Sequence, residues 1–458
     1  MGKTKIEKLV ESQYDFFNSQ QTKDISFRKN ALKKLRNALI DKEKDLMEAL
    51  WSDMHKSNFE TYANELGQVL NEIDQHIRKI KYWCKPQRRR TPLELLPSRS
   101  RIYKEPYGNV LIVAPWNYPL LLMIDPLIGA ISAGNCVVLK PSPYLENFGK
   151  YLDKLIGEIF PPEYITVVHG NREINKLLLA QKWDYIFFTG SPELGKVVMK
   201  AAAENLTPVT LELGGKSPCI VDEDANLKLA ARRIVWGKFI NAGQTCIAPD
   251  YLLVHEKVKA ELLELMKKEL HRFYGDDPQK SKDFCRIVNQ NAFNRLSELL
   301  SEGRIIVGGI TNADEKYIAP TIIDKVEADF PIMQEEIFGP LLPVMTFSSL
   351  SKAIDFVDSC EKPLALYYFS NDLKKVKRVL QLTSSGGGCI NDTVIHIANG
   401  RLPFGGVGNS GMGKYHGRLS FETFTNLRSI IYSSRWIDIP FKYPPYSKGK
   451  LKLVKRLL

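Results

Sequence analysis

The sequence predicts an α/β fold with a parallel, doubly wound sheet, on three observations. From about residue 109 onward, short apolar runs such as NVLIVAP, NCVVLKP, YITVVHG and DYIFFTG each close on a proline or a glycine. Helical stretches such as ENFGKYLDKLIGEIF separate these runs. Strands that are apolar along their whole length are buried on both faces, as in parallel sheets covered by helices. The length of 458 residues allows roughly two or three domains.

The expected elements follow in order along the chain. Residues 1–83 repeat apolar positions at spacings of three and four, which predicts amphipathic helices. The longest apolar run, residues 119–139, contains Asp125 and Pro126, so we expect a buried helix followed by a strand rather than a membrane span. A second alternation of strands and helices begins near residue 212 and predicts a second α/β domain. The chain ends in a glycine-rich loop and a basic tail.

The composition argues against several classes of protein. The seven cysteines are scattered without a C-x-x-C motif, and the N-terminus has no apolar signal segment, so we expect free thiols and a cytoplasmic location. The net charge of +12 would favour anionic partners. The basic residues are spread out, however, and no nucleic-acid-binding motif is present, so we predict a solvated basic surface and no nucleic-acid partner. The histidines never fall at metal-ligand spacing with cysteine, which predicts no metal site.

Residues 184–206 predict a strand, a glycine turn and a helix, and the turn is a candidate phosphate site. Ser191 is a good N-cap, and Gly190 and Gly195 would let a pyrophosphate approach the free N–H groups of the helix. An ordinary capped helix start is the alternative. The segment spells most of a P-loop, but Val197 stands where that motif needs Ser or Thr.

Lys140 adds a cation to the same candidate site. In VVLKPSP it stands at the carboxyl end of the predicted strand, which is the end where open α/β sheets bind ligands. An exposed lysine at such a place usually serves solubility alone. Together with the glycine turn on another strand, it favours a nucleotide.

Three further residues could carry chemistry. Cys246 lies in the turn GQTCIAPDY, Glu212 ends the strand VTLEL, and Asn117 follows a strand in APWNYP. A thiol needs a lowered pKa or a neighbouring base to react fast. A part-buried carboxylate has a raised pKa suited to a general base, and an Asn amide can donate to a developing oxyanion. Taken alone, Cys246 would more often be an inert core residue, but the combination favours a nucleophile.

The chain resembles the aldehyde dehydrogenase superfamily and looks closest to its class 3 branch, which acts on fatty and aromatic aldehydes. The motifs PWNYP, LKPS, FTGSPELG, LELGGKSP, GQTCIAPDY, EEIFGP and LPFGGVGNSGMGKYHG stand in family order across residues 115–417. The resemblance implies that Cys246 is the nucleophile and that Glu212 activates hydrolytic water. Asn117, with the Cys246 backbone N–H, would form the oxyanion hole. An NAD or NADP site without a metal is also implied, formed by Trp116, Lys140, Gly190, Ser191, Gly195, Glu336 and Phe338.

The implied reaction oxidises an aldehyde to a carboxylic acid through a cysteine thiohemiacetal and a thioester. A relative that passes the acyl group to coenzyme A and a retired enzyme kept as a binding or structural protein stay open as alternatives. Pro143 stands where NAD-preferring members commonly carry Glu, so we expect relaxed coenzyme choice. The resemblance also implies a substrate tunnel whose aromatic walls favour long apolar or aromatic aldehydes. Its expected lining is Tyr118, Trp236, Phe239 and Phe404.

The fold that the resemblance implies is a Rossmann-like cofactor domain, a catalytic domain and a β-arm for oligomerisation, and a homodimer is the expected assembly. The predicted division is a dinucleotide-binding domain of residues 1–84 and 107–211, a catalytic domain of 212–417, an arm of 85–106 and 418–440, and a basic tail of 441–458. The tail could lie on an anionic membrane surface, or it could be a frayed, solvated terminus. Its apolar side would be Leu451, Leu453, Val454, Leu457 and Leu458.

Overall fold

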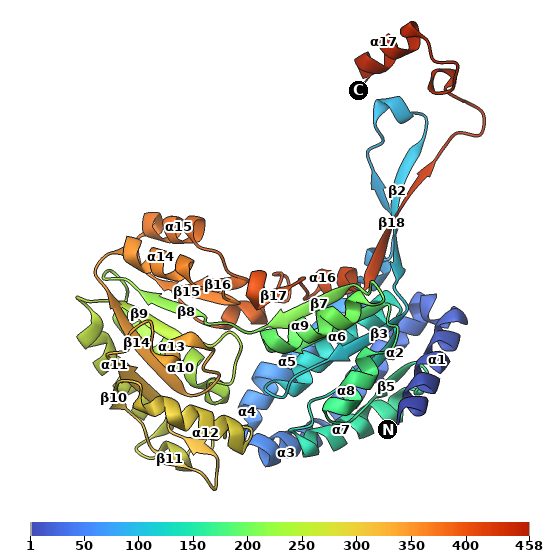
Figure 1. The fold of residues 1–458 in the computed structure, drawn as a ribbon. Coiled ribbons are helices and arrows are strands. Elements are labelled where there is room, and N and C mark those ends of the chain that lie inside the picture. The colour runs from blue at the N-terminus through green and yellow to red at the C-terminus, as the bar shows by residue number, and fades with distance from the viewer. Residues whose placement is uncertain (1, 458) are drawn as a thin grey trace.

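Two sheets and a projecting arm organise the chain in the computed structural model, which describes residues 2–457 (Figure 1). One lobe holds the N-terminal helices and a six-stranded sheet, and the other holds a seven-stranded sheet. The arm projects from the first lobe, and the C-terminal helix lies near its far end. The predicted α/β fold class is confirmed.

The six-stranded sheet is built from the apolar runs that predicted it. Its strand order is β17-β7-β6-β3-β4-β5, and all neighbours run parallel except the short edge strand β17. The strands are β3 (Asn109–Val113), β4 (Cys136–Lys140), β5 (Ile165–Val167), β6 (Tyr185–Gly190), β7 (Val209–Leu213) and β17 (Gly411–Met412). The carboxyl ends of the five parallel strands therefore meet at one edge of the sheet.

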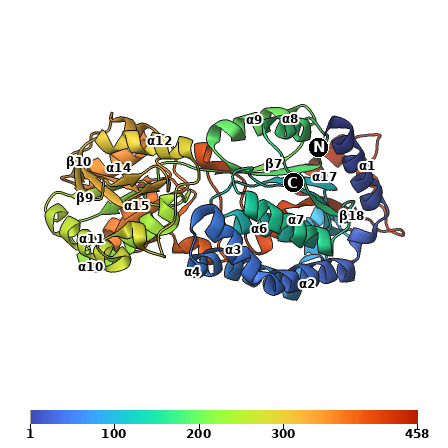
Figure 2. The ribbon, with the colours of Figure 1, turned by 90° about the horizontal axis from the view of Figure 1, so that it is seen from below.

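Helices cover both faces of this sheet (Figure 2). Side chains of a strand alternate between its faces, so Leu111 and Val138 join one buried cluster while Val110 and Val137 join another. One face packs against α1 (Lys3–Asn18), α8 (Arg172–Leu179) and α9 (Pro192–Ala203). The other packs against α2 (Ile25–Asp41), α5 (Gly67–Trp83), α6 (Pro119–Ala133) and α7 (Glu146–Ile159).

The N-terminal region is helical as predicted, and the apolar run from 119 is a buried helix followed by a strand. Every residue of α6 is buried. Between α2 and α5 the chain forms α3 (Glu43–Met54), α4 (Asn58–Thr61) and one π-helical turn, Tyr62–Leu66. Within residues 2–457, no helix combines the length and the apolar character needed to cross a membrane.

The seven-stranded sheet has the order β10-β13-β14-β9-β8-β15-β16. Its strands are β8 (Pro218–Val221), β9 (Tyr251–His255), β10 (Arg304–Val307), β13 (Thr321–Asp324), β14 (Leu341–Phe347), β15 (Ala365–Phe369) and β16 (Gly387–Ile390), with a separate ribbon of β11 (Thr311–Asn312) and β12 (Tyr317–Ile318). The helices of this lobe are α10 (Leu227–Phe239), α11 (Lys259–Tyr274), α12 (Gln290–Glu298), α13 (Pro331–Gln334), α14 (Leu350–Ser359) and α15 (Leu373–Leu382). Figure 1 shows α10 and α11 on one side of the sheet and α14 and α15 on the other.

The arm is a three-stranded antiparallel sheet of β1 (Gln87–Arg89), β2 (Arg99–Pro106) and β18 (Thr425–Tyr432). The helix α16 (Arg418–Thr423) precedes β18, and α17 (Lys448–Leu457) forms the tail. Leu458 lies outside the described residues. The domain limits stay a prediction, and two strands bear on them: β7 crosses the predicted limit at 212, and β17 lies within 212–417 yet belongs to the six-stranded sheet.

Candidate active site

The turn that carries Cys246 is tightly constrained. It follows the 3₁₀ segment Ile240–Gly243, in which Asn241 and Ala242 adopt left-handed backbone angles with φ near 50°. Gly243 has φ 72°, and a Cβ there would lie 2.2 Å from the carbonyl oxygen of Gly339, so both the angle and the space require glycine. Cys246 is partly exposed although both of its neighbours are buried.

The thiol of Cys246 lies close to two acids. Burial is the main cause that raises its pKa, and the charges of Glu336 and Glu212 raise it further. The backbone N–H groups of Cys246 and Ile247 act in the opposite direction. A thiol must lose its proton before it can act as a nucleophile, and the surroundings of Cys246 oppose that loss.

Asn117 reaches the Cys246 turn from the other lobe. It lies on the loop between β3 and α6, and its buried Nδ2 donates to the carbonyl oxygen of Gln244 at 3.0 Å. Next to it, the Tyr118 hydroxyl is 2.7 Å from Thr245 Oγ1. The structure thus brings Asn117 and Tyr118 against the two residues that precede Cys246.

Glu212 is a buried acid whose polar atoms are left without partners. Its side chain is 3% exposed, and neither carboxyl oxygen has a hydrogen-bond partner among the described residues. Burial raises the pKa of this carboxyl well above its ordinary value, and the nearby charge of Lys414 opposes the shift. Gly405 leaves space for this carboxyl, because its φ is 147° and a Cβ there would lie 2.7 Å from Glu212 Oε1.

The candidate coenzyme residues lie at neighbouring strand ends. Lys140, at the end of β4, is buried, its Nζ donates to the carbonyl oxygen of Pro141 at 2.7 Å, and burial lowers its pKa to about 8. After β6, Ser191 caps α9 and accepts from the Leu194 N–H. Gly195 packs α9 against β7, because a Cβ there would lie 2.7 Å from Leu213. A helix N-terminus beside a lysine suits a phosphate-bearing coenzyme.

Glu336 and Phe338 come from the second lobe and meet the first. A Cβ on Gly214, directly after β7, would lie 2.0 Å from Glu336 Oε2, so the glycine makes room for this carboxyl. Burial raises the pKa of Glu336 to about 8, with the Asp250 charge acting in the same direction. Phe338 packs edge-on against Trp116 at 5.5 Å between ring centroids. The site therefore lies where the two lobes meet.

The predicted tunnel residues differ in their surroundings. Tyr118, Phe239 and Phe404 are buried, whereas Trp236 is 36% exposed. Phe404 stacks on His416 with 5.2 Å between ring centroids. The surroundings of Phe404 are therefore less purely apolar than the sequence suggested. Trp236 lies three residues before Phe239 on α10, and its place in a tunnel stays a prediction.

Comparison with known proteins agrees with this geometry. A sequence model described as "Aldehyde dehydrogenase family" matches residues 1–430. The chain belongs to the aldehyde dehydrogenase family. Members use NAD or NADP, and the protein is an NAD(P)-dependent aldehyde oxidoreductase with the Rossmann-like fold of that family.

Individual relatives cover nearly the whole chain. The 4,4'-diaponeurosporen-aldehyde dehydrogenase of Staphylococcus aureus is 52% identical over 442 residues, with 96% of each chain covered. The mouse aldehyde dehydrogenase family 3 member B3 is 46% identical over 453 residues, covering 98% of this chain and 94% of its own. A structure of the substrate-bound state of Staphylococcus aureus AldH superposes with a TM-score of 0.97 at 51% identity, covering 98% and 99% of the two chains. The predicted resemblance to the class 3 branch is confirmed.

Sequence reasoning missed a group of buried charges in this aldehyde dehydrogenase. Lys56, Glu60 and Glu65 follow α3, and all three are buried. Lys238 on α10 is also buried, and its Nζ lacks a hydrogen-bond partner among residues 2–457. A usable signal is present in HKSNFETYANEL, where charged residues continue while the regular helical spacing of apolar positions breaks down.

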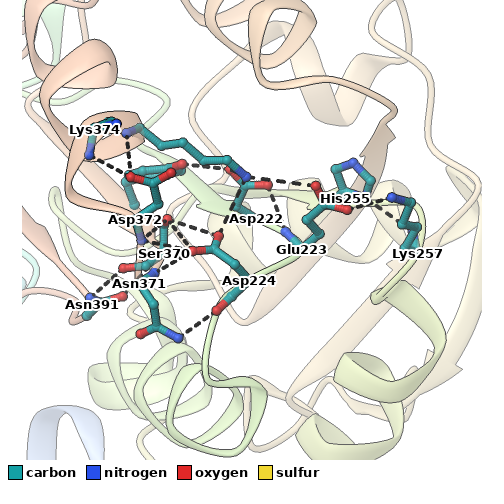
Figure 3. A network of polar contacts seen from close by, with 12 residues as sticks. Asp222, Glu223, Asp224, His255, Lys257, Ser370, Asn371, Asp372, Lys374 and Asn391 are labelled. Atoms are coloured by element: carbon teal, nitrogen blue, oxygen red, sulfur yellow. Dashed lines mark hydrogen bonds and ion pairs between the residues drawn. The ribbon is translucent and has the colours of Figure 1, made fainter.

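A second acidic group lies in the seven-stranded lobe, away from the predicted site residues. Asp222, Glu223 and His255 place one potential metal-ligand atom each within 4.8 Å of one another. Figure 3 shows that hydrogen bonds and ion pairs surround these acids. Lys257 lies 2.7 Å from Glu223, and Lys375 lies 3.1 Å from Asp222, so lysines occupy the position that a cation would take.

Proposed function

We propose that Cys246, Glu212 and Asn117 carry the oxidation of the aldehyde, with Cys246 as the nucleophile. The observation that supports this most is the state of Glu212. Its buried oxygens have no partner among the described residues, and its charge acts on the Cys246 thiol. A structural acid would be fully hydrogen-bonded, whereas an acid held in this way is suited to bind and deprotonate a water molecule.

The chain's own residues would act in sequence. The Cys246 thiol gives its proton to solvent and its sulfur forms a bond to the aldehyde carbon, and the carbonyl oxygen becomes an oxyanion that Asn117 Nδ2 and the Cys246 backbone N–H hold. The coenzyme, when bound, supplies the hydride acceptor. Glu212 then takes a proton from the water that attacks the thioester. The C–S bond breaks, and the carboxylic acid and the Cys246 thiolate are released.

A direct test measures aldehyde-dependent absorbance at 340 nm with each coenzyme. Lys140, Ser191 and the α9 N-terminus would hold the coenzyme's phosphate and ribose groups. Because Pro143 is exposed and offers no carboxylate to repel a 2′-phosphate, we expect the two coenzymes to be used within about tenfold in kcat/KM, a gap of ~1.4 kcal/mol. A preference for NAD beyond about a thousandfold, ~4 kcal/mol, would refute this interpretation of Pro143.

The proposed substrates are long apolar or aromatic aldehydes. The support is the buried aromatic set of Tyr118, Phe239 and Phe404 and the diaponeurosporen-aldehyde in the name of a 52% identical relative. Along a series of linear alkanals, each added CH₂ should strengthen substrate binding by up to ~0.8 kcal/mol. KM should therefore fall with chain length until the tunnel is full. The product decides between mechanisms: a free acid supports Glu212-activated water, and an acyl-coenzyme A ester would support transfer to coenzyme A.

The proposed assembly is a homodimer formed through the arm. β18 lies at the edge of the arm sheet and β16 at the edge of the seven-stranded sheet, and an unpaired strand edge is a surface on which another chain can pair. Light scattering during size-exclusion chromatography should give twice the monomer mass. A variant that lacks residues 85–106 and 418–458 should not.

The proposed location is cytoplasmic, with peripheral membrane contact through the tail. Leu451 and Leu453 of α17 are exposed among lysines and arginines, as in helices that lie on anionic membranes. Sedimentation with anionic liposomes at low and high salt tests this against a deletion of residues 441–458. Equal pelleting of both proteins would leave the tail with no membrane role.

A further inference from the structure

A cluster of buried charges lies directly behind the proposed oxyanion hole. Lys56 and Glu65 are both 0% exposed, and the Lys56 ammonium is 2.5 Å from Glu65 Oε1. Removing two charges from water is costly, and a hydrophobic pair of similar size is often equally stable. Stability alone is therefore a weak reason for such a pair, and its further contacts indicate what it does.

Those contacts converge on Asn117 and the helix that follows it. Lys56 Nζ donates to the Asn117 carbonyl oxygen at 3.2 Å and lies 4.1 Å from the centre of the Tyr118 ring. The second oxygen of Glu65 accepts the N–H groups of Leu120 and Leu121, at 2.8 and 3.3 Å. These are free donors in the first turn of α6. The ion pair thus fixes the backbone on both sides of the Asn117 side chain.

The same cluster also holds the turn before the nucleophile. Glu60 Oε2 accepts the backbone N–H of Asn241 at 3.1 Å, and Asn241 Nδ2 donates to the Asn117 carbonyl oxygen at 2.9 Å. Asn241 has φ 50°, a left-handed conformation that a non-glycine residue adopts only when its surroundings enforce it. Asn117 and the Cys246 turn are therefore tied to one set of buried charges.

The backbone that carries these charges is itself irregular. Glu65 lies in the π-helical turn Tyr62–Leu66, and Glu60 lies five residues before it on α4. A π-helical turn makes i→i+5 backbone hydrogen bonds, and such turns occur frequently at functional sites. Glu65 accepts backbone N–H groups of α6, and Glu60 accepts that of Asn241.

We propose that Lys56, Glu60 and Glu65 are positioning residues for aldehyde oxidation, which hold the Asn117 amide and the Cys246 turn in the geometry that binds the oxyanion. The proposal rests on the roles given above to Asn117 and Cys246. None of the three charged side chains needs to touch the substrate. They act through the Asn117 carbonyl oxygen and the Asn241 N–H.

The test is the double variant K56M/E65Q, alone and combined with N117A. Both charges are removed together so that Glu65 is not left buried without its ammonium partner, and the Gln oxygen can still accept the N–H groups of α6. We expect kcat to fall by about 10- to 100-fold, up to the loss expected when a catalytic group is displaced by about 1 Å. Coenzyme affinity, measured by fluorescence titration, should change less than about twofold, since the coenzyme residues are untouched.

The decisive measurement is the coupling between K56M/E65Q and N117A in their effects on kcat. If Lys56 acts through Asn117, adding K56M/E65Q to N117A should lower kcat by less than about twofold further, because the interaction is already lost. Losses that multiply, or a wild-type kcat in K56M/E65Q, would overturn the proposal. The matched control is K104M/E422Q, which removes another partly buried ion pair of 3.2 Å at the foot of the arm and should leave kcat unchanged.

A second variant keeps the test informative if K56M/E65Q does not fold. E60Q keeps the size and one acceptor oxygen but weakens the hydrogen bond from the Asn241 N–H, because a carboxylate accepts more strongly than an amide. The displaced turn should slow alkylation of Cys246 by iodoacetamide and lower kcat together, each by about three- to tenfold. Unchanged values for both would overturn the role of Glu60. Turnover in C246A, or a wild-type kcat in N117A, would instead contradict the proposed function, so the two failures can be told apart.

Discussion

Glu212 and Asp222 are two buried acids at the ends of parallel strands, one in each sheet, and their surroundings are opposite. Asp222, after β8, is 1% exposed; it accepts the Glu223 N–H and the Tyr368 hydroxyl, both at 2.7 Å, and pairs with Lys375 (Figure 3). Glu212, in β7, is equally buried, but its oxygens have no such partners among residues 2–457. The first acid has hydrogen-bond partners in the fold, whereas the second lacks them among the described residues, as the proposed role of a general base requires.

The lysine near each acid shows the same difference between Asp222 and Glu212. Lys375 points its ammonium at Asp222 and lies within 4 Å of Glu223 and Asp224 as well. Lys414, the lysine whose charge acts on Glu212, instead donates to the carbonyl oxygens of Gly386 and Gly405. Glu212 therefore gains little compensation for its burial, and its carboxyl retains a proton more readily.

The largest expected effect on kcat distinguishes a cysteine near Glu212, Cys246, from a cysteine in the strand before Asp222, Cys219. C246A should lower kcat by at least about 10⁴-fold, because a reaction unit that loses its nucleophile keeps only binding and oxyanion contributions. C219A removes a thiol that is buried inside β8 and should keep its activity. Steady-state kinetics and coenzyme titration of both variants test this, and turnover in C246A would contradict the mechanism.

E212Q should lower turnover by about 10²- to 10⁴-fold, the usual contribution of a general base. The loss should fall on hydrolysis of the thioester, since acylation uses Cys246 and Asn117. Rapid-quench experiments should therefore show a burst of reduced coenzyme followed by a stalled enzyme. Steady turnover at the wild-type rate would indicate that another acid, such as Glu336, is the base.

The pH dependence follows from the burial of Glu212. Since burial raises the pKa of its carboxyl, the carboxylate that acts as base is lost as pH falls through that raised pKa, and the deacylation rate of the wild type should rise with pH. Stability should change in the opposite direction. The folded state binds this proton more tightly than the unfolded state, so the stabilisation is complete below the ordinary carboxyl pKa and is lost as pH rises through the folded pKa.

E212Q is the control for both halves of that prediction. Its residual deacylation should be flat with pH, because the amide does not titrate in this range. Its melting temperature relative to the wild type should increase as pH rises, since only the wild type must bury a charge. Parallel pH profiles of the two proteins, in stopped-flow kinetics and in thermal unfolding, would show that Glu212 is not the titrating group.

D222N should affect stability and leave chemistry alone. The amide cannot accept from both the Glu223 N–H and the Tyr368 hydroxyl while also pairing with Lys375, so we expect a loss of about 1–3 kcal/mol in the free energy of unfolding. Urea unfolding measures that loss, and kcat per folded molecule should equal the wild-type value. A fall in kcat with normal stability would remove the distinction between the two acids.

The sequence predicted the fold through its local patterns. The apolar runs ending at proline or glycine became β3, β4, β5 and β6, and the amphipathic repeat became the N-terminal helices. Alternation of this kind leaves few topologies, because parallel strands need helical crossovers of one hand. The basic tail, for which a frayed terminus was the alternative, forms α17.

The candidate site was only partly predictable, for a physical reason. Glu212, Asn117 and Cys246 stand beside glycines, prolines or strand ends, which mark them in the sequence. Lys56 and Glu65 have no such mark, since a charged pair in a helical region usually lies on the solvated face. Only the three-dimensional contact with the Asn117 carbonyl oxygen shows that the pair faces inward.

The smallest expected effect concerns metal binding at the satisfied acids. Asp222, Glu223 and His255 have a spacing that could suit a cation, but the ammonium groups of Lys257 and Lys375 already neutralise the two carboxylates. A divalent ion would have to displace both lysines and three hydrogen bonds. We therefore expect Zn²⁺ or Mn²⁺ to leave the melting temperature unchanged, although binding to the native state alone would raise it. The matched variant K257M/K375M removes the two ammonium groups, so its melting temperature should rise when the metal is added. A metal-dependent rise in the melting temperature of the wild type would show instead that this acidic group binds a cation.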